Sequence, residues 1–345
     1  MASSAGQSLS MHRLERTSLL GRRAMVDQVQ RTLRAESGSL LTLAGVGGVG
    51  KTRVALAAIR PLSDRFPDGI HFVDLGGVDD VGRLLPAIAD AVTDNDRARG
   101  DGTVLSRAAG QLTGRQLLVL DGFDLVGAAA PSVSALLDHC PGLSILVTNR
   151  WPLHMTAERV IHLPGLSFPP VGATLSIAEL SEYTAVQLYV ERAQAHRPEF
   201  ILQPDNAPAV AEICRRLDGL PLAIELAAAL VQFLEPPALL AQAGHWLAVL
   251  TGGARDGPDH QRSLRSSIDR SYQLLAPAEQ SMFRRVAVFT GGFSIPAAAA
   301  AAGVTIGPAF HTLAAWSRRT CCNGRPVARR RSRSARCGVN MPKSS

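Results

Sequence analysis

The stretch that decides the fold is residues 40–52, Leu-Leu-Thr-Leu-Ala-Gly-Val-Gly-Gly-Val-Gly-Lys-Thr. Its opening residues are apolar or β-branched and predict a buried strand, and the residues after the glycines predict a helix. The turn between them fits the phosphate-loop pattern G-x-x-x-x-G-K-[ST], in which glycine backbones place N–H groups against phosphate oxygens at the start of a helix. We therefore predict that this loop binds a nucleotide through Gly45, Val46, Gly47, Gly48, Val49, Gly50, Lys51 and Thr52.

The lysine of this loop is unusual in the composition of the chain. Of the 36 Lys and Arg residues, only Lys51 and Lys343 are lysine. A compact, strongly hydrated ammonium suits the β- and γ-phosphates of a nucleotide, whereas a guanidinium fits that position poorly. Lys51 is therefore predicted to reach these phosphates, and the hydroxyl of Thr52 is predicted to bind Mg²⁺.

Further along the chain, apolar runs alternate with stretches of helical periodicity. Besides residues 40–44, strands are predicted at residues 70–74, 117–121 and 144–148. Strands that alternate with helices form βαβ units. The predicted fold class is therefore α/β, a P-loop NTPase parallel sheet with helices on both faces.

Two of the predicted strands are followed by residues that suit nucleotide chemistry. Residues 117–121 are four apolar residues followed by Asp121, which is typical of a Walker B strand whose carboxylate holds Mg²⁺ through water. Arg150 follows the strand at 144–148 and could contact a γ-phosphate. We predict both as catalytic residues, with a helix cap for Asp121 and a solvated strand end for Arg150 as the structural alternatives.

The same glycines also fit the pattern G-x-G-x-x-G of a Rossmann dinucleotide site, with Asp74 about 24 residues downstream. Lys51, Thr52 and the acid at position 121 favour a nucleoside triphosphate over NAD. A Rossmann-type, NAD-dependent oxidoreductase is therefore the less favoured alternative.

The net charge of +7 is unevenly distributed. No Asp or Glu follows Glu279, and residues 318–345 contain eight Arg and one Lys, so residues 1–317 carry a net charge of −2. The basicity belongs to the C-terminal tail, so the total charge is a poor guide to nucleic-acid binding.

Cysteine usage and hydropathy bear on the cellular compartment. Only Cys140 and Cys214 lie outside the tail, which argues against a disulfide framework and predicts a reducing cytoplasm. Residues 286–316 carry no Asp, Glu, Lys or Arg, but their Gly and Pro interruptions predict a buried strand followed by a helix rather than a membrane span. We expect no membrane partner.

The domain organisation follows from a change of pattern after the prolines at 169 and 170. Helical periodicity dominates residues 186–193, 210–217 and 221–234. The predicted parts are a flexible N-terminus at 1–17, a nucleotide-binding domain at 18–168, a helical domain at 169–252, a third segment at 253–315 and a basic tail at 316–345.

Six stretches of the chain form an ordered set: Leu-Gly-Arg at 20–22, the loop at 45–52, and residues 117–124, 147–153, 219–228 and 264–293. Taken in this order they resemble the nucleotide-binding core of STAND-class signal-transduction ATPases, which are relatives of NB-ARC ATPases. The resemblance is to the version found in bacterial LuxR- and SARP-type transcriptional regulators. The resemblance covers about residues 19–315 and implies that the third segment is an incomplete winged helix.

This resemblance implies roles for individual residues. Gly21, Arg22 and Arg53 would bind the nucleotide, and Pro221 would lie on its adenine side, although a helix-opening proline explains that residue equally well. Arg150 would sense the γ-phosphate.

The chain also departs from the family pattern near the predicted Walker B strand. The family usually has Asn after the Asp and a Glu further on, where this chain has Gly122 and Asp124. Asp124 could still orient water as a catalytic residue, but its shorter side chain predicts slow hydrolysis or none. Arg23 stands where the family has Glu.

The function implied by the resemblance is an ATP- or ADP-binding regulatory switch with Mg²⁺ as the metal. Its expected partners are the nucleotide and either other proteins or further copies of the chain, with DNA reached only indirectly. The alternative is a DNA-binding regulator that acts through the winged helix or the basic tail.

The tail departs from the family altogether after Ala315. Permitted codons for residues 316–324, read one base earlier, give LVEANLLQR, and the same shift over residues 332–345 gives LEIREVRREYAEEL. Both strings resemble family sequence at the expected places. We hypothesise that one base was lost near Ala315 and truncated a longer regulator, which the nucleotide sequence of the gene would test.

Overall fold

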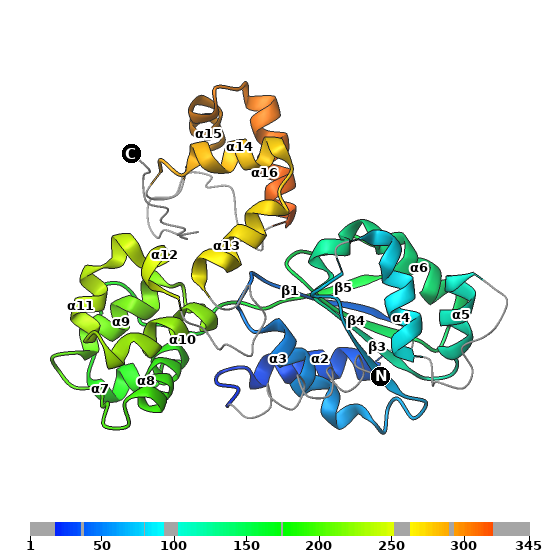
Figure 1. Cartoon of the computed structure of the whole chain (residues 1–345), viewed down its shortest axis with the longest axis horizontal. Helices are drawn as coiled ribbons and strands as arrows, with labels where there is room; N and C mark the ends of the chain where they lie inside the picture. The colour runs from blue at the N-terminus through cyan, green and yellow to red at the C-terminus, as the bar shows by residue number, and fades with distance from the viewer. Residues whose placement is uncertain are drawn as a thin grey trace. The chain divides into compact units, whose positions relative to one another are not determined.

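A computed structural model shows how the chain is arranged (Figure 1). It describes residues 18–35, 38–78, 80–92, 103–173, 175–251, 263–289 and 293–319, with side chains up to residue 315. The predicted flexible N-terminus and most of the predicted basic tail lie outside these ranges. The hypothesis of a lost reading frame concerns mainly the same tail residues. The chain divides into two compact units, residues 1–45 with 50–163, and residues 46–49 with 164–345.

The first unit is built on a parallel sheet of five strands in the order β2-β3-β4-β1-β5 (Figure 1). The strands are β1 (Leu40–Ala44), β2 (Ile70–Asp74), β3 (Leu117–Asp121), β4 (Ser144–Asn149) and β5 (Glu158–His162). The first four confirm the strands predicted from apolar runs, with β4 extending to Asn149. Every residue of β1 and β4 is buried, as expected for strands inside a parallel sheet.

Strand β5 was missing from the sequence prediction. It pairs with β1 at the edge of the sheet and buries only Ile161. An edge strand needs no continuous apolar run, so its Glu-Arg-Val-Ile-His sequence carries little strand signal. The Glu158 carboxylate also accepts N–H groups from Leu153 and His154, which fixes the turn that leads into the strand.

Helices cover both faces of this sheet, with α2 and α3 on one face and α4, α5 and α6 on the other (Figure 1). Residues Ile145 and Val147 of β4 pack in one core cluster with Ile88 and Val133 from the latter helices. This arrangement confirms the predicted α/β fold class. The helical elements are α2 (Arg23–Ala35), α3 (Lys51–Ile59), α4 (Leu84–Val92), α5 (Val104–Gln111) and α6 (Ala130–His139), with 3₁₀ turns η1 (Arg60–Leu62), η2 (Val81–Arg83) and η3 (Phe123–Ala129).

The strand order decides between the two readings of the glycine loop. A Rossmann sheet has the order 3-2-1-4-5-6, in which the first and second strands are neighbours. Here β1 lies between β4 and β5, and β3 and β4 separate it from β2. Asp74, at the end of β2, therefore cannot bind a ribose beside the loop that follows β1. The fold argues against the NAD-dependent alternative.

The second unit is built of helices. Helices α8 and α9 confirm the predicted periodicity, because Val186, Tyr189, Val210 and Ile213 are buried on the predicted faces. The elements are α7 (Ile177–Ser181), α8 (Thr184–His196), α9 (Ala207–Arg216), α10 (Pro221–Ala229), η4 (Leu230–Gln232), α11 (Pro236–Ala241), η5 (Ala243–His245), α12 (Trp246–Val249), α13 (Leu264–Gln273), α14 (Pro277–Val286), α15 (Ile295–Ala302) and α16 (Ile306–Arg319). The helix predicted at 221–234 is shorter than expected and ends at Ala229 in the turn η4.

The segment 286–316 differs from the prediction of a strand followed by a helix. Helix α14 ends at Val286, and the described residues after it form a turn and the two helices α15 and α16. The alanine run accounts for helix α15, since alanine has the highest helix propensity and packs closely in a small cluster with Met282 and Val286. The winged-helix assignment of this segment stays a prediction.

A membrane span is not found in any single helix of the described residues. The helices at Ile295–Ala302 and Ile306–Ala315 pass the length and hydropathy criteria only as a pair bent by 106°.

The turn between α9 and α10 requires a glycine. Gly219 has φ of +64°, and a Cβ at this position would lie 2.1 Å from the carbonyl oxygen of Leu166. The Gly219 carbonyl also accepts a hydrogen bond from Leu166 N at 2.8 Å. Two backbone segments of the second unit are therefore in direct contact here.

We expect Gly219→Ala to lower the Tm of the protein by several degrees, because the added methyl group would collide with backbone atoms. The matched control is Gly172→Ala. Gly172 has φ of +73°, but among the described atoms beyond its chain neighbours none lies within 4 Å of its Cβ position. The control therefore has only the left-handed backbone cost of about 1–2 kcal/mol. Thermal unfolding followed by circular dichroism measures both variants, and equal shifts would contradict the proposed collision.

Candidate nucleotide-binding site

The phosphate loop joins β1 to α3 at the carboxyl edge of the sheet. Gly50 has φ of +99° and occupies the N-cap position of α3, where no side chain caps the helix. A left-handed residue here lets the chain turn directly from the loop into the helix. Gly50 has no side chain to cap α3, and the N-terminal end of a helix favours an anion.

Lys51 lies against the loop from which it starts. Its Nζ donates a hydrogen bond to the carbonyl oxygen of Gly45 at 2.8 Å, so the side chain folds back along the loop. The ammonium is half-buried and lies close enough to Asp121 to lower the pKa of that carboxyl, although this is the smallest of the influences on it. The Lys51 ammonium, which is predicted to bind phosphate, therefore lies beside the start of the loop.

Asp121 is the centre of a hydrogen-bonded group of side chains. The hydroxyl of Thr52 lies 2.8 Å from Oδ1 and 2.9 Å from Oδ2 of this carboxylate. Thr148 Oγ1 donates to Oδ1 at 2.6 Å, and it accepts a hydrogen bond from Gly122 N at 2.9 Å. The structure thus brings together Thr52 and Asp121, as predicted, and adds Thr148, which the sequence did not single out.

The environment of Asp121 shifts its ionisation. Burial raises the pKa of Asp121, while the hydrogen bonds from Thr148 and Thr52 partly offset this effect. The nearby carboxylate of Asp74 adds to the rise in pKa. Asp74 is the register partner of Asp121 between β2 and β3, so the two acids end neighbouring strands.

The donor set around Asp121 fits Mg²⁺ when tested on its chemistry. Mg²⁺ binds oxygen ligands and commonly takes one or two from the protein, completing its shell with phosphate oxygens and water. Thr52 and Asp121 provide a hydroxyl and a carboxylate that already lie at hydrogen-bond distance from each other. The described residues contain no cluster of three or more His, Cys, Asp or Glu side chains suited to a metal. Thr52 and Asp121 therefore suit a Mg²⁺ ion whose remaining ligands are phosphate oxygens and water.

Asp124 and Arg150 form an ion pair at the same edge of the sheet. Arg150 N donates to Asp124 Oδ1 at 2.7 Å, and Arg150 Nε donates to Oδ2 at 3.3 Å. Arg150 N also lies 3.0 Å from the side-chain oxygen of Asn149. The sequence singled out both charged residues but did not predict that they contact each other.

Three residues singled out by the family resemblance lie at the start of the first unit or on α3. Gly21 and Arg22 precede α2, and burial of the Arg22 side chain lowers its pKa to about 10. Arg53 donates from Nη2 to the carbonyl oxygen of Ser18 at 2.7 Å. Their nucleotide-binding roles stay predictions.

Pro221 is the first residue of α10 in the second unit, so its helix-opening role is realised. The neighbouring Leu222 N donates to the carbonyl oxygen of Gly48 at 3.2 Å, within the unit that includes residues 46–49. The adenine-side role of Pro221 stays a prediction.

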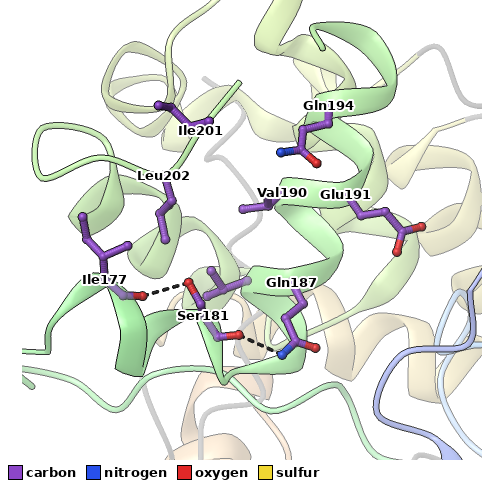
Figure 2. A pocket seen from close by; sticks show the side chains of 9 residues that line it. Ile177, Ser181, Gln187, Val190, Glu191, Gln194, Ile201 and Leu202 are labelled. Atoms are coloured by element: carbon purple, nitrogen blue, oxygen red, sulfur yellow. Dashed lines mark hydrogen bonds between the residues drawn. The ribbon is translucent and has the colours of Figure 1, made fainter. Parts of the chain in front are cut away.

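A separate groove of about 430 Å³ lies in the second unit, between α7, α8 and residues 201–202 (Figure 2). It was not predicted from the sequence, and it contains none of the predicted site residues. Ser181 and Gln187 on its wall are hydrogen-bonded to backbone carbonyls of Ile177 and Ser181, respectively. Its lining is formed by Ile177, Ser181, Val186, Gln187, Val190, Glu191, Gln194, Ile201 and Leu202.

The sequence is similar to several bacterial proteins. It is 33% identical over 286 residues to the uncharacterized protein Rv0894 of Mycobacterium tuberculosis, covering 82% of this chain and 68% of that protein. It is 40% identical over 272 residues to a protein of the same organism named as an HTH-type transcriptional regulator, Rv0890c, covering 78% of this chain. Regulatory protein AfsR of Streptomyces griseus is 28% identical over 306 residues, covering 84% of this chain.

The chain belongs to the same family as Rv0894, and its sequence is also similar to part of an HTH-type transcriptional regulator and of the regulatory protein AfsR. It spans 29% of the length of Rv0890c and 28% of the length of AfsR. No protein-family model matches the sequence.

Solved structures with partial likeness include the Aeropyrum pernix ORC1 protein in complex with DNA, at a TM-score of 0.41 and 17% identity, covering 88% of this chain and 84% of that one. Another is the STAND protein PH0952 of Pyrococcus horikoshii, which has a tetratricopeptide repeat sensor, at a TM-score of 0.36 and 12% identity, covering 86% of this chain and 38% of that one.

The raised pKa of Asp121 leads to a prediction for stability. Because its folded-state pKa lies above its unfolded value, the ionised carboxylate destabilises the folded protein, and this cost is complete above the folded pKa. We expect Asp121→Asn to raise the Tm of the nucleotide-free protein at pH 7, since a neutral amide of the same shape removes the cost. The difference from the wild type should shrink as the pH falls towards about 4, where the unfolded-state carboxyl is protonated too.

The matched control for this variant is Asp27→Asn on α2, where the aspartate is exposed. Its Tm should stay close to that of the wild type, because surface substitutions change stability by about 0.5 kcal/mol or less. Differential scanning calorimetry across pH measures both variants. A lower Tm for Asp121→Asn than for the control would show that the hydrogen bonds outweigh the burial cost.

Proposed function

We propose that this chain binds ATP or ADP together with Mg²⁺ at the phosphate loop and acts as a regulatory, ATPase-like module. The observation that supports this most strongly is the contact of Thr52 with both oxygens of Asp121, at 2.8 and 2.9 Å. These residues are 69 positions apart in the sequence. Their contact places the last residue of the phosphate-loop motif against the acid that ends β3, as Mg²⁺–nucleotide binding requires.

Each group of residues would make a different contact with the nucleotide. The N–H groups of the loop and of the first turn of α3 would donate to phosphate oxygens, and the Lys51 ammonium would exchange the Gly45 carbonyl for the β- and γ-phosphates. Thr52 and Asp121 would hold Mg²⁺, which when bound neutralises phosphate charge. Arg150 is the proposed contact of the γ-phosphate.

The regulatory part of the proposal comes from the relatives, one named as an HTH-type transcriptional regulator and others as the regulatory protein AfsR. We propose that the nucleotide state of this chain changes which surfaces it presents to other proteins or to further copies of itself. DNA would be reached indirectly, hydrolysis would be slow or lacking, and the cytoplasm is the expected location.

Direct DNA binding by the third segment is the second candidate, and two contacts speak against it. Arg284 donates to the hydroxyl of Tyr272, and Arg285 donates to the carbonyl oxygen of Ala302. These arginines therefore help to pack α13, α14 and α15. DNA affinity that falls steeply with salt and persists in a protein ending at Ala315 would favour this candidate.

We expect Lys51→Ala to abolish binding of MgATP, because no other lysine lies in the first 342 residues to replace its ammonium. The Tm without nucleotide should be nearly unchanged. The measurement is the rise in Tm that ATP, ADP or NAD produces, since a ligand that binds only the folded state raises the Tm.

The matched control is Arg31→Ala, which removes an exposed positive charge from α2. It should keep the wild-type response to ATP. Undiminished ATP affinity in Lys51→Ala would overturn the assignment of the site, and a Tm rise with NAD but not with ATP would restore the dinucleotide alternative.

A further inference from the structure

The ion pair of Asp124 and Arg150 is buried on both sides. The side chains are 9% and 6% exposed, respectively. Asp124 lies in η3, after β3, and Arg150 directly follows β4. Each carboxylate oxygen accepts one N–H group of the same arginine, one from its backbone and one from its guanidinium.

This arrangement makes Asp124 poorly suited to orient a water molecule for attack. A residue with that role must offer a carboxylate oxygen to the water, within about 3 Å. Oδ1 of Asp124 accepts the backbone N–H of Arg150 and Oδ2 accepts Nε of its guanidinium, so rotating the carboxylate toward a water molecule would break both contacts. Breaking a buried ion pair in this way is strongly unfavourable.

The same contacts fix Arg150 at two points. Its backbone is held through N and its side chain through Nε, so both the start of the side chain and the plane of the guanidinium are set. The orientation of the guanidinium matters because its planar, fork-like geometry matches two phosphate oxygens. An arginine held in this way loses little conformational entropy when it meets an anion.

We infer that Asp124 is a positioning residue that holds Arg150 for recognition of the γ-phosphate, and that it is not the residue that orients water. The inference rests on the proposed nucleotide binding and deepens it, because it assigns the discrimination between ATP and ADP to a pair of residues. The pair links the ends of β3 and β4, so the presence of a γ-phosphate is reported to η3 as well as to Arg150.

The test is a double-mutant cycle with Asp124→Asn, Arg150→Ala and the double variant. The readout is the ratio of the Kd for MgADP to the Kd for MgATP, measured by titration calorimetry. We expect each single variant to lower the preference for ATP by about fivefold to tenfold, and the double variant to lower it no further. Asp124→Glu keeps a carboxylate for Nε and should retain the preference within about twofold.

The matched control is Glu225→Gln in the second unit, which removes the carboxylate from a similar contact, Arg192 Nε to Glu225 Oε1 at 3.2 Å. It should leave the ratio unchanged. If Asp124→Asn unfolds the protein, Arg150→Lys replaces it, because lysine keeps the charge but lacks the Nε donor and the planar fork. A wild-type ratio in Arg150→Lys would overturn the inference.

Three other results would also overturn it. The first is an unchanged ratio in Asp124→Asn together with slower hydrolysis, which would mark Asp124 as the water-orienting residue. The second is additive losses in the double variant. The third is a wild-type protein that binds both nucleotides with equal affinity. A wild-type protein that binds neither nucleotide would instead defeat the proposed function.

Discussion

A carboxylate that is largely withdrawn from solvent needs hydrogen-bond donors, and in this protein the half-buried carboxylate of Asp121 joins three elements of the first unit. Asp121 ends β3, and its partners come from the first turn of α3 and from the end of β4. An isolated buried carboxylate would cost several kcal/mol. The hydroxyls of Thr52 and Thr148 reduce that cost, but burial still dominates the pKa. These hydrogen bonds hold the first turn of α3 beside the ends of β3 and β4.

The sequence was informative wherever a local pattern carries the signal. Four strands, the phosphate loop and the helices α8 and α9 were predicted because apolar runs, glycine spacing and helical periodicity are properties of short segments. The edge strand β5 was missed, since pairing with β1 on one side needs only one buried residue, Ile161. The strand expected after Val286 is not present among the described residues, where residues 287–289 form a turn and the alanine-rich stretch Ile295–Ala302 forms a helix.

In the candidate site, too, residues within a sequence motif were predicted, whereas residues brought together by the order of the strands were not. Lys51, Thr52 and Asp121 were identified by motif, but Thr148 was not, because a threonine at a strand end becomes a carboxylate partner only when its strand lies beside β3. The order of strands in a parallel sheet is a tertiary property that spacing along the chain does not reveal. The pairing of Asp124 with Arg150 depends on the same neighbour relation, so from the sequence alone the two residues were assigned separate roles.

The backbone contact of Leu166 with Gly219 has a consequence for dividing the chain experimentally. Ser167 adds to it, since Thr184 N donates to Ser167 Oγ at 3.1 Å and Ala185 N donates to the Ser167 carbonyl at 3.0 Å. The residues from Pro164 to Ser167 therefore belong structurally with the helices, although the proline-rich bend suggested a boundary after them. A fragment that begins at Val171 would lack Leu166 and would therefore lose its backbone contact with Gly219. No side chain at Gly219 can make up for this loss. The helical unit should be expressed from a start before Pro164.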